Sequence, residues 1–416
     1  MGKLISSVST ALGYGAVMAS MSLLSTGTAQ EGAHLPSKID LVPAFQKLGL
    51  APQAQKARDT CSLFAITALA DFECARSASQ PGKRLSEEFL IWAANEATGR
   101  KGDQAMFYEA VHGLNALGIC TRELMPYLAS PDAQRKPQPT ALADAKALSG
   151  RWQVQWIKRW DVKRPLSPPA MLAIKGALAS GHPVACGLRW PKAFKGHALL
   201  DVPPPDKVFD GHSIALVGYQ DDPKEPGGGT LLFRNSAGPG WGDGGYGVMS
   251  YSYARAYAND ALWLRLGPPK SELPVERFEA ELLKVLASGK CGTRTQNMAG
   301  YGGPMWSQGR QRFCRAQKDG FVELGFTVSK SGSYRLRILA TAAPDFGTIR
   351  ITLDGDDCGP DLNLYSGRVC PSGPLELGNH RLTAGTHRIR FTVVGKDAMS
   401  ANYCMGLDAL DLIAAE

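Results

Sequence analysis

The sequence predicts an α+β protein, in which a domain with one helical lobe and one β-rich lobe precedes an all-β sandwich. Three observations support this prediction. Apolar residues follow helical spacing early in the chain, strand patterns dominate later, and the pattern changes to short alternating strands after a proline-rich stretch at 267–274. The 416 residues are enough for two or three domains, each with its own core.

Helix signals mark the first lobe. Apolar residues recur every four positions after Cys61, and Asp59 or Thr60 can cap that helix. Residues 85–88 are typical of a capped helix start. A further helix is predicted after Ser167, because the two prolines that follow fit a first helical turn.

The later chain is typical of strands separated by turns. Residues 182–186 begin a strand of the first domain, and strands of the sandwich are predicted at Phe321–Val328, Tyr334–Ala340, Thr348–Leu353 and His387–Val394. We therefore expect an export signal at 1–29, the two-lobed domain at 30–266, a linker at 267–275 and the sandwich at 276–416.

The N-terminus indicates export. Lys3 is followed by a weakly apolar stretch and by small residues at 27–29, which is typical of a cleaved signal peptide. We expect a secreted or periplasmic protein with no membrane anchor after cleavage. The net charge of +8 comes without a run of Lys or Arg, so nucleic acid is not a predicted partner.

The nine cysteines fit an oxidising compartment, and the odd count leaves at least one unpaired. Disulfide bonds are expected, and the reasonable pairs are Cys291–Cys314, Cys358–Cys370 and Cys74–Cys120. No C-x-x-C spacing occurs, which argues against a zinc site. No cofactor or metal is predicted.

Cys61 is the first candidate for chemistry. A thiol reacts as the thiolate, and a helix N-terminus favours that charge. Taken alone, a cysteine that opens an apolar helix is more often a buried structural residue. The residues downstream favour the reactive alternative.

His212 precedes an apolar stretch at 213–219, and Asn235 precedes a glycine-rich segment at 238–246. Thiol catalysis needs a base for the thiol proton and a third group that accepts a hydrogen bond from the other ring nitrogen of the base. An amide oxygen can accept that bond without adding a full negative charge.

These residues resemble the papain-like cysteine peptidases over roughly 35–266. The resemblance is carried by Gln55 with Cys61, by residues 85–87, by Pro126-Tyr127, by His212 before S-I-A-L-V-G-Y, and by N-S-A-G-P-G-W-G-D-G-G-Y from Asn235. It implies a papain-like two-lobed catalytic domain that hydrolyses protein or peptide substrates.

The same resemblance implies the roles of single residues. Cys61 is the nucleophile, His212 the base and then the acid, and Asn235 the residue that orients His212. Gln55 and the backbone N–H of Cys61 bind the oxyanion. Trp241 packs beside the His–Asn pair and keeps water away.

Five positions depart from the family pattern. Arg58 replaces a disulfide cysteine of many relatives, Ser62 replaces an aromatic residue, and Ala237 replaces a tryptophan that shields the Asn–His contact. Asp59 adds negative charge beside Cys61 unless it caps the helix. Asp103 stands near a glycine that pairs with the substrate backbone in relatives.

Alternatives remain. His197 is a competing base, although no strand and asparagine follow it at suitable spacing, and the other histidines are expected to be ordinary: His34, His112, His182, His380 and His387. Instead of a secreted cysteine peptidase, the chain is alternatively an inert surface-binding or glycan-binding protein on the same fold. The third option is a cell-wall amidase or acyltransferase with the same thiol chemistry.

The last part of the chain carries F-E-A-E at 278–281, S-G-S-Y at 331–334, L-D-G at 353–355, L-T-A-G-T-H at 382–387 and G-L-D-A-L-D-L at 406–412. With these motifs, residues 276–416 resemble the jelly-roll-like, carbohydrate-binding modules of secreted bacterial enzymes, so a carbohydrate or cell-surface ligand is expected. The resemblance implies that the first and last strands are adjacent. Glu279, Glu281 and Asp408 or Asp411 then either bind a structural calcium or are simply solvated on edge strands. Four aromatic residues either stack on sugar rings or fill a core: Tyr301, Trp306, Phe346 and Tyr365.

Overall fold

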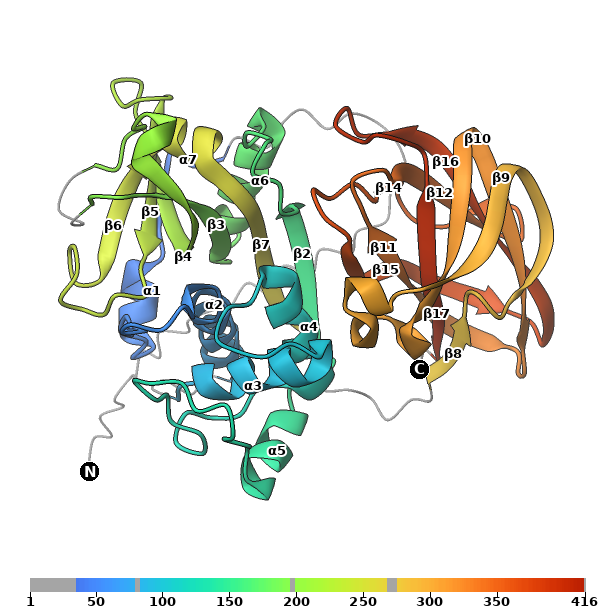
Figure 1. Ribbon diagram of the computed structural model, residues 1–416, viewed down its shortest axis with the longest axis horizontal. Helices are drawn as coiled ribbons and strands as arrows, with labels where there is room; N and C mark the ends of the chain where they lie inside the picture. Colours follow the sequence, from blue (N-terminus) through green and yellow to red (C-terminus); the bar gives the residue numbers. More distant parts are fainter. Residues whose placement is uncertain (1–34, 79–82, 195–198, 268–274, 415–416) are drawn as a thin grey trace, which may run out of the picture. The chain divides into compact units, whose positions relative to one another are not determined.

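The computed structural model describes residues 35–78, 83–194, 199–267 and 275–414. The predicted export signal, most of the predicted linker, His34 and His197 lie outside these ranges. The described chain is mixed α/β, as predicted, and both of its sheets belong to the compact unit that begins at Pro36 (Figure 1).

Seven α-helices lie in the first part of the described chain: α1 (Val42–Lys47), α2 (Cys61–Ala78), α3 (Glu87–Thr98), α4 (Phe107–Leu117), α5 (Pro139–Lys146), α6 (Pro168–Ala179) and α7 (Tyr251–Tyr257). The three predicted helix starts are confirmed. The hydroxyl of Ser86 accepts from Phe89 N–H, and that of Ser167 accepts from Ala170 N–H, so each caps its helix.

An antiparallel seven-stranded sheet accompanies these helices. Its strands are β1 (Lys38–Asp40), β2 (Trp152–Lys158), β3 (Val184–Pro191), β4 (Val208–Asp221), β5 (Gly229–Arg234), β6 (Tyr246–Ser250) and β7 (Ala258–Leu266). The order is β2-β7-β3-β4-β5-β6, with β1 also paired to β4. Helix α2 packs against β3, β4 and β7, and on its other side against α3 and α4 (Figure 1). The apolar α2 is therefore buried on both sides.

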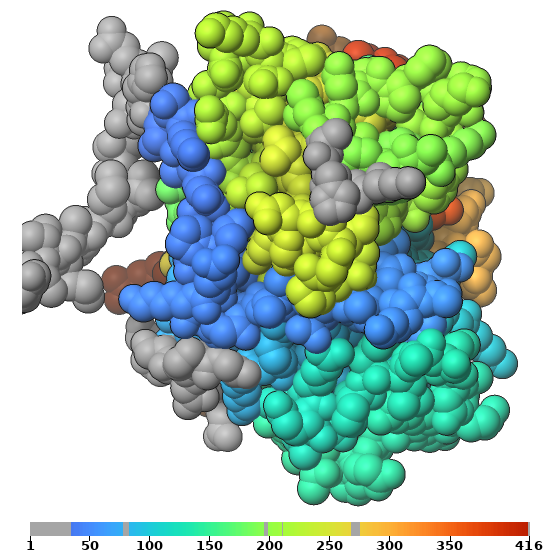
Figure 2. Space-filling view, turned by 90° about the vertical axis from the view of Figure 1, so that its left-hand side faces the viewer, coloured from blue at the N-terminus to red at the C-terminus, as the bar shows by residue number. Residues whose placement is uncertain are grey.

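The N-terminal segment connects this sheet to the helices. Leu41 N–H donates to Val217 O on β4, and Arg84, just before α3, donates to Ala51 O. In Figure 2 the blue segment lies between the yellow-green residues of the sheet and the teal residues that follow α4. The segment that leads to Cys61 thus contacts both parts.

The chain from 275 to 414 forms strands and short 3-10 turns, without an α-helix among its described residues. The strands are β8 (Val275–Glu279), β9 (Lys284–Asn297), β10 (Arg310–Val328), β11 (Gly332–Ala342), β12 (Gly347–Leu353), β13 (Asp356–Asp357), β14 (Leu362–Asn363), β15 (Cys370–Leu382), β16 (Gly385–Lys396) and β17 (Met405–Ala414). All four strand predictions are confirmed. The order β13-β12-β16-β10-β17-β11-β15 encloses one apolar core. The jelly-roll topology stays a prediction.

In the part of the chain that the structure describes, no helix combines the length and apolar character needed to cross a membrane.

Candidate active site

Cys61 is the first residue of α2, and its side chain is partly exposed. As the first helical residue it has a backbone N–H without an intrahelical acceptor. Its Sγ lies 3.8 Å from Gly211 O, directly before His212. Burial raises the pKa of the thiol, while hydrogen bonds from the backbone and hydroxyl of Ser213 act in the opposite direction. The sulfur therefore contacts both sequence neighbours of His212, Gly211 and Ser213.

His212 lies on β4, and Asn235 follows β5. His212 Nε2 is 2.8 Å from Asn235 Oδ1. The backbone N–H of Ser236 donates to the same Oδ1 at 2.8 Å, which identifies this atom as the amide oxygen. His212 Nε2 must therefore carry a proton, and in the neutral ring Nδ1 is the free acceptor.

Burial lowers the pKa of His212, and the bond to Asn235 opposes this only in part. A neutral imidazole with a free Nδ1 is the form that can accept a thiol proton. Two of the three predicted site residues, His212 and Asn235, are thus hydrogen-bonded, and Cys61 contacts Gly211, which directly precedes His212.

Gln55 lies before α2, and both the oxygen and the nitrogen of its side-chain amide are hydrogen-bonded. Its Oε1 accepts from Ser236 Oγ at 2.5 Å, and its Nε2 donates to Arg58 O at 2.7 Å. Its backbone N–H also donates to Ser236 O. An amide group has two N–H bonds, so one remains for a further acceptor. Ser236 links this donor to Asn235.

Trp190 on β3 contacts the His212 ring, a contact that no sequence pattern predicted. The two rings meet edge to face with centroids 4.5 Å apart. Trp241, which the resemblance places beside the His–Asn pair, packs on Trp190 and on Phe233, with ring centroids 6.3 and 5.9 Å apart. Ala237 replaces the shielding tryptophan that the family pattern implies. Its backbone forms an isolated β-bridge with that of Ala54. The aromatic cover of His212 thus comes from β3.

Polar contacts dominate around Cys61. Asp59 was predicted either to cap α2 or to add free negative charge, and its carboxylate accepts from Gln104 Nε2 at 3.0 Å. It still raises the pKa of Cys61, after the larger effect of burial. The hydroxyl of Ser62 donates to Ala105 O at 2.5 Å.

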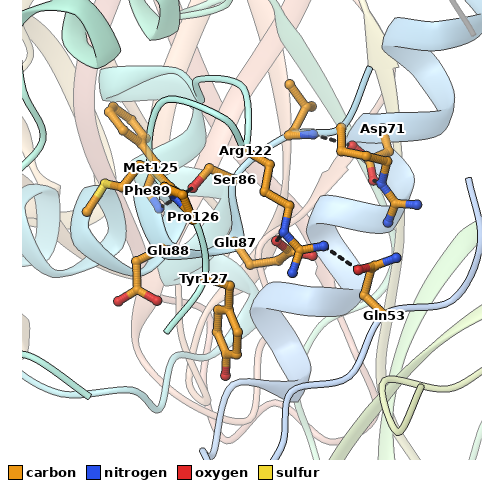
Figure 3. Close-up of polar contacts among 12 residues, drawn as sticks. Gln53, Asp71, Ser86, Glu87, Glu88, Phe89, Arg122, Met125, Pro126 and Tyr127 are labelled. Atoms are coloured by element: carbon orange, nitrogen blue, oxygen red, sulfur yellow. Dashed lines mark hydrogen bonds and ion pairs between the residues drawn. The ribbon is translucent and has the colours of Figure 1, made fainter. Parts of the chain in front are cut away.

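Figure 3 shows a cluster of charged residues that includes Asp71, Glu87 and Arg122. Arg84 pairs with Asp71 at 3.0 Å, and Arg122 lies 3.7 Å from Glu87 and donates to Gln53. Burial raises the pKa of Glu87 to about 7. These contacts join α2, α3 and the segment before Cys61.

Solvated carboxylates were the alternative to a calcium site, and Asp408 and Asp411 do not fit that alternative. Asp408 and Asp411 are buried. Arg277 and Arg337 both pair with Asp411 and hold its pKa low although burial opposes this, so Asp411 is not free for a metal. Burial raises the pKa of Asp408 to about 8. Among the described residues, no group of three or more His, Cys, Asp and Glu side chains is placed to hold a metal ion.

The aromatic residues of this part mostly fill its interior. Trp306 and Phe346 are buried, and Tyr365 donates to Asp161 at 2.6 Å. Tyr301 is exposed. These positions do not form the aromatic sugar-binding surface that was one of the two expectations.

All nine cysteines are free thiols. Among the expected pairs, Cys291 on β9 and Cys314 on β10 share a side-chain hydrogen bond. Cys358 instead lies 3.2 Å from His380 Nε2, and Cys370 contacts Ser366 Oγ. The expected disulfides are therefore not formed in this structure.

No protein-family model matches the chain, and no curated protein is similar to it in sequence. Among solved structures it is similar to xylellain, a cysteine protease from Xylella fastidiosa, with 24% identity and a TM-score of 0.46, over 57% of this chain and 88% of that chain. It is also similar to procathepsin L 3 of Tenebrio molitor larval midgut, with 20% identity and a TM-score of 0.42, over 56% and 71% of the two chains. The Amb a 11 cysteine protease of ragweed pollen in its proform gives 20% identity and a TM-score of 0.42, over 56% and 66%. Each of these likenesses extends over little more than half of this chain.

Proposed function

We propose that the chain is a cysteine peptidase that hydrolyses peptide bonds through Cys61, His212 and Asn235. The observation that carries this proposal is the hydrogen bond from His212 Nε2 to Asn235 Oδ1. This bond leaves Nδ1 of His212 as the acceptor. Gly211 and Ser213, the sequence neighbours of His212, both contact the Cys61 sulfur.

Hydrolysis begins when His212 Nδ1 takes the proton of the Cys61 thiol and Sγ attacks the peptide carbonyl carbon. The carbonyl oxygen becomes an oxyanion, which the free N–H of Gln55 and the backbone N–H of Cys61 bind. His212 then gives the proton to the leaving amine, and an acyl-thioester remains on Cys61. Water, activated by the same imidazole, hydrolyses the thioester.

Cleavage of a peptide library by the wild type and by Cys61→Ala tests this proposal. We expect defined cleavage products from the wild type and none from the variant. Intact peptides with both proteins would favour the inert binding protein. Release of products from purified cell wall, with the peptide library left intact, would favour the amidase.

We further propose that the protein is secreted or periplasmic, with residues 1–29 as its signal, the peptidase domain at 30–266 and the jelly-roll sandwich at 276–416. In an oxidising compartment, Cys291 and Cys314 would form a disulfide, because their thiols already share a hydrogen bond across β9 and β10. Peptide mapping of the exported protein would show the linked peptide, and two free thiols would contradict it.

A further inference from the structure

Three consecutive residues before α4 contact the segment around the nucleophile. Asp103 pairs with Arg58 at 2.7 Å, while Gln104 and Ala105 bind Asp59 and Ser62 as described above. Arg58, Asp59 and Ser62 are the three positions beside Cys61 that depart from the pattern of relatives. They therefore belong to one set of contacts with a single loop.

Arg58 is the centre of this set. Its side chain is 3% exposed and forms two hydrogen bonds with Glu88, at 2.7 and 3.3 Å, and two with Asp103, at 2.8 and 2.7 Å. It also donates to Leu128 O and lies over the Tyr127 ring at 4.7 Å. Burial alone would lower the pKa of this guanidinium, but Asp103 and Glu88 raise it above its ordinary value. The planar guanidinium is thus held from several directions.

Two neighbouring glutamates on α3 serve different partners. Figure 3 shows Glu87 beside Arg122, and Glu88 pointing away from that pair. Glu88 binds Arg58, and it also accepts from Leu128 N–H at 3.0 Å. It therefore fixes both Arg58 and the loop that carries Tyr127.

Tyr127 brings this network back to the segment before the nucleophile. Its hydroxyl lies 2.8 Å from Gln55 O and 2.9 Å from the hydroxyl of Thr60. Arg58 O accepts from Gln55 Nε2 at 2.7 Å and from Thr60 N–H at 2.9 Å. Arg58 O thus accepts from one N–H of Gln55, while the side chain of Arg58 pairs with the carboxylates of Glu88 and Asp103.

We propose that Arg58 is a positioning residue for the oxyanion donor Gln55. The inference rests on the proposed peptidase function. The side chain of Arg58 fixes its own carbonyl through Glu88 and Asp103, and this carbonyl holds one N–H of the Gln55 amide so that the other points to the oxyanion. The donor is strongest when it is already aligned in the resting protein.

Arg58→Lys tests the inference, because lysine keeps the charge but cannot form paired bonds with two carboxylates at once. We expect kcat to fall by roughly ten- to a hundredfold with KM changed by less than about twofold, since donors to an oxyanion act in the transition state. In a Gln55→Ala background the same substitution should lower kcat by less than about twofold, because the residue through which Arg58 acts is already gone.

Arg312→Lys is the matched control. Arg312 is also buried and binds the backbone carbonyls of Ala280, Glu281 and Leu283, within the β-rich part of the chain. It should leave kcat unchanged. A fall in kcat of equal size with and without Gln55 would overturn the inference, and so would an unchanged kcat in folded Arg58→Lys.

A second readout does not depend on turnover. The side-chain amide signals of Gln55, assigned through their loss in Gln55→Ala, are expected to shift or broaden in Arg58→Lys and to stay in place in Arg312→Lys. If the wild type cleaves no peptide, the proposed function fails, and these signals still decide the inference. Unchanged Gln55 signals in Arg58→Lys would overturn it.

Discussion

The two sides of the candidate site hold their residues by different means. On the nucleophile side, ion pairs and hydrogen bonds fix the segment before α2, with buried Arg58 between Glu88 and Asp103. On the proposed base side, around His212, the ring of Trp190 on β3 contacts His212, and Trp241 of the glycine-rich segment packs on Trp190.

The difference follows from what each side has to do. The Gln55 amide has to point in one direction, and directional bonds to charged groups achieve that. In the proposed reaction the resting imidazole has to be neutral so that it can take the thiol proton, and its bond to Asn235 has to exclude water. Apolar rings achieve both by desolvation. Substitutions on the two sides should therefore change different observables.

The largest effect is expected where the two sides meet. Cys61→Ser and His212→Ala should each lower kcat for peptide hydrolysis by on the order of 10⁴ to 10⁶, because the two residues act as one unit. The measurement is steady-state hydrolysis of a fluorogenic peptide. Cys74→Ser is the control, as a second partly buried cysteine on α2, and should retain wild-type activity.

A pH titration tests the base side. Because burial lowers the pKa of His212, its titration midpoint should lie below the ordinary value of about 6.5, so the imidazole is mostly neutral at that pH and above. The measurement is the NMR titration of the His212 ring in Cys61→Ala, which removes coupling to the thiol. A midpoint at or above 6.5 would show that the ring is not desolvated.

The cover of the base is the next target. Trp190→Ala should lower kcat by roughly tenfold and move the His212 pKa upward toward 6.5, since water then reaches the ring. Trp190→Phe keeps an aromatic ring and should restore most of the activity. Trp241 packs on Trp190. If Trp241→Ala moved the His212 pKa more than Trp190→Ala does, the assignment of the aromatic cover to Trp190 would be wrong.

The smallest effect concerns charge on the nucleophile side. Asp59→Asn removes one group that raises the pKa of Cys61, so iodoacetamide should modify Cys61 about threefold faster at pH 7. Glu96→Gln, at an exposed position of α3, should leave the rate unchanged. A slower reaction in Asp59→Asn would mean that Asp59 assists the thiolate.

Residue type and spacing predicted Cys61, His212 and Asn235 as the site. In the structure His212 bonds to Asn235, and Cys61 contacts Gly211, which directly precedes His212. The helix at Cys61 and the strands of the C-terminal part were also predictable, because apolar spacing depends on local geometry.

The supporting contacts were beyond such patterns. Trp190 reaches His212 because β3 pairs with β4 through an irregular register after Leu188, which no local spacing reveals. Asp59 was predicted either to cap α2 or to add free negative charge, and neither alternative included its bond to Gln104 from a distant loop. In the C-terminal part, the buried Asp411 pairs with two arginines that lie far away in sequence.

Acylation of Cys61 tests the central claim most directly, namely that Cys61 and His212 act together on a carbonyl. An N-acyl amino acid p-nitrophenyl ester is mixed with the protein, the reaction is stopped in acid, and the acyl group is located by peptide mapping. The account predicts an acyl group on Cys61 in the wild type and almost none in His212→Ala. Ester hydrolysis without acylated Cys61, or equal acylation in both proteins, would contradict it.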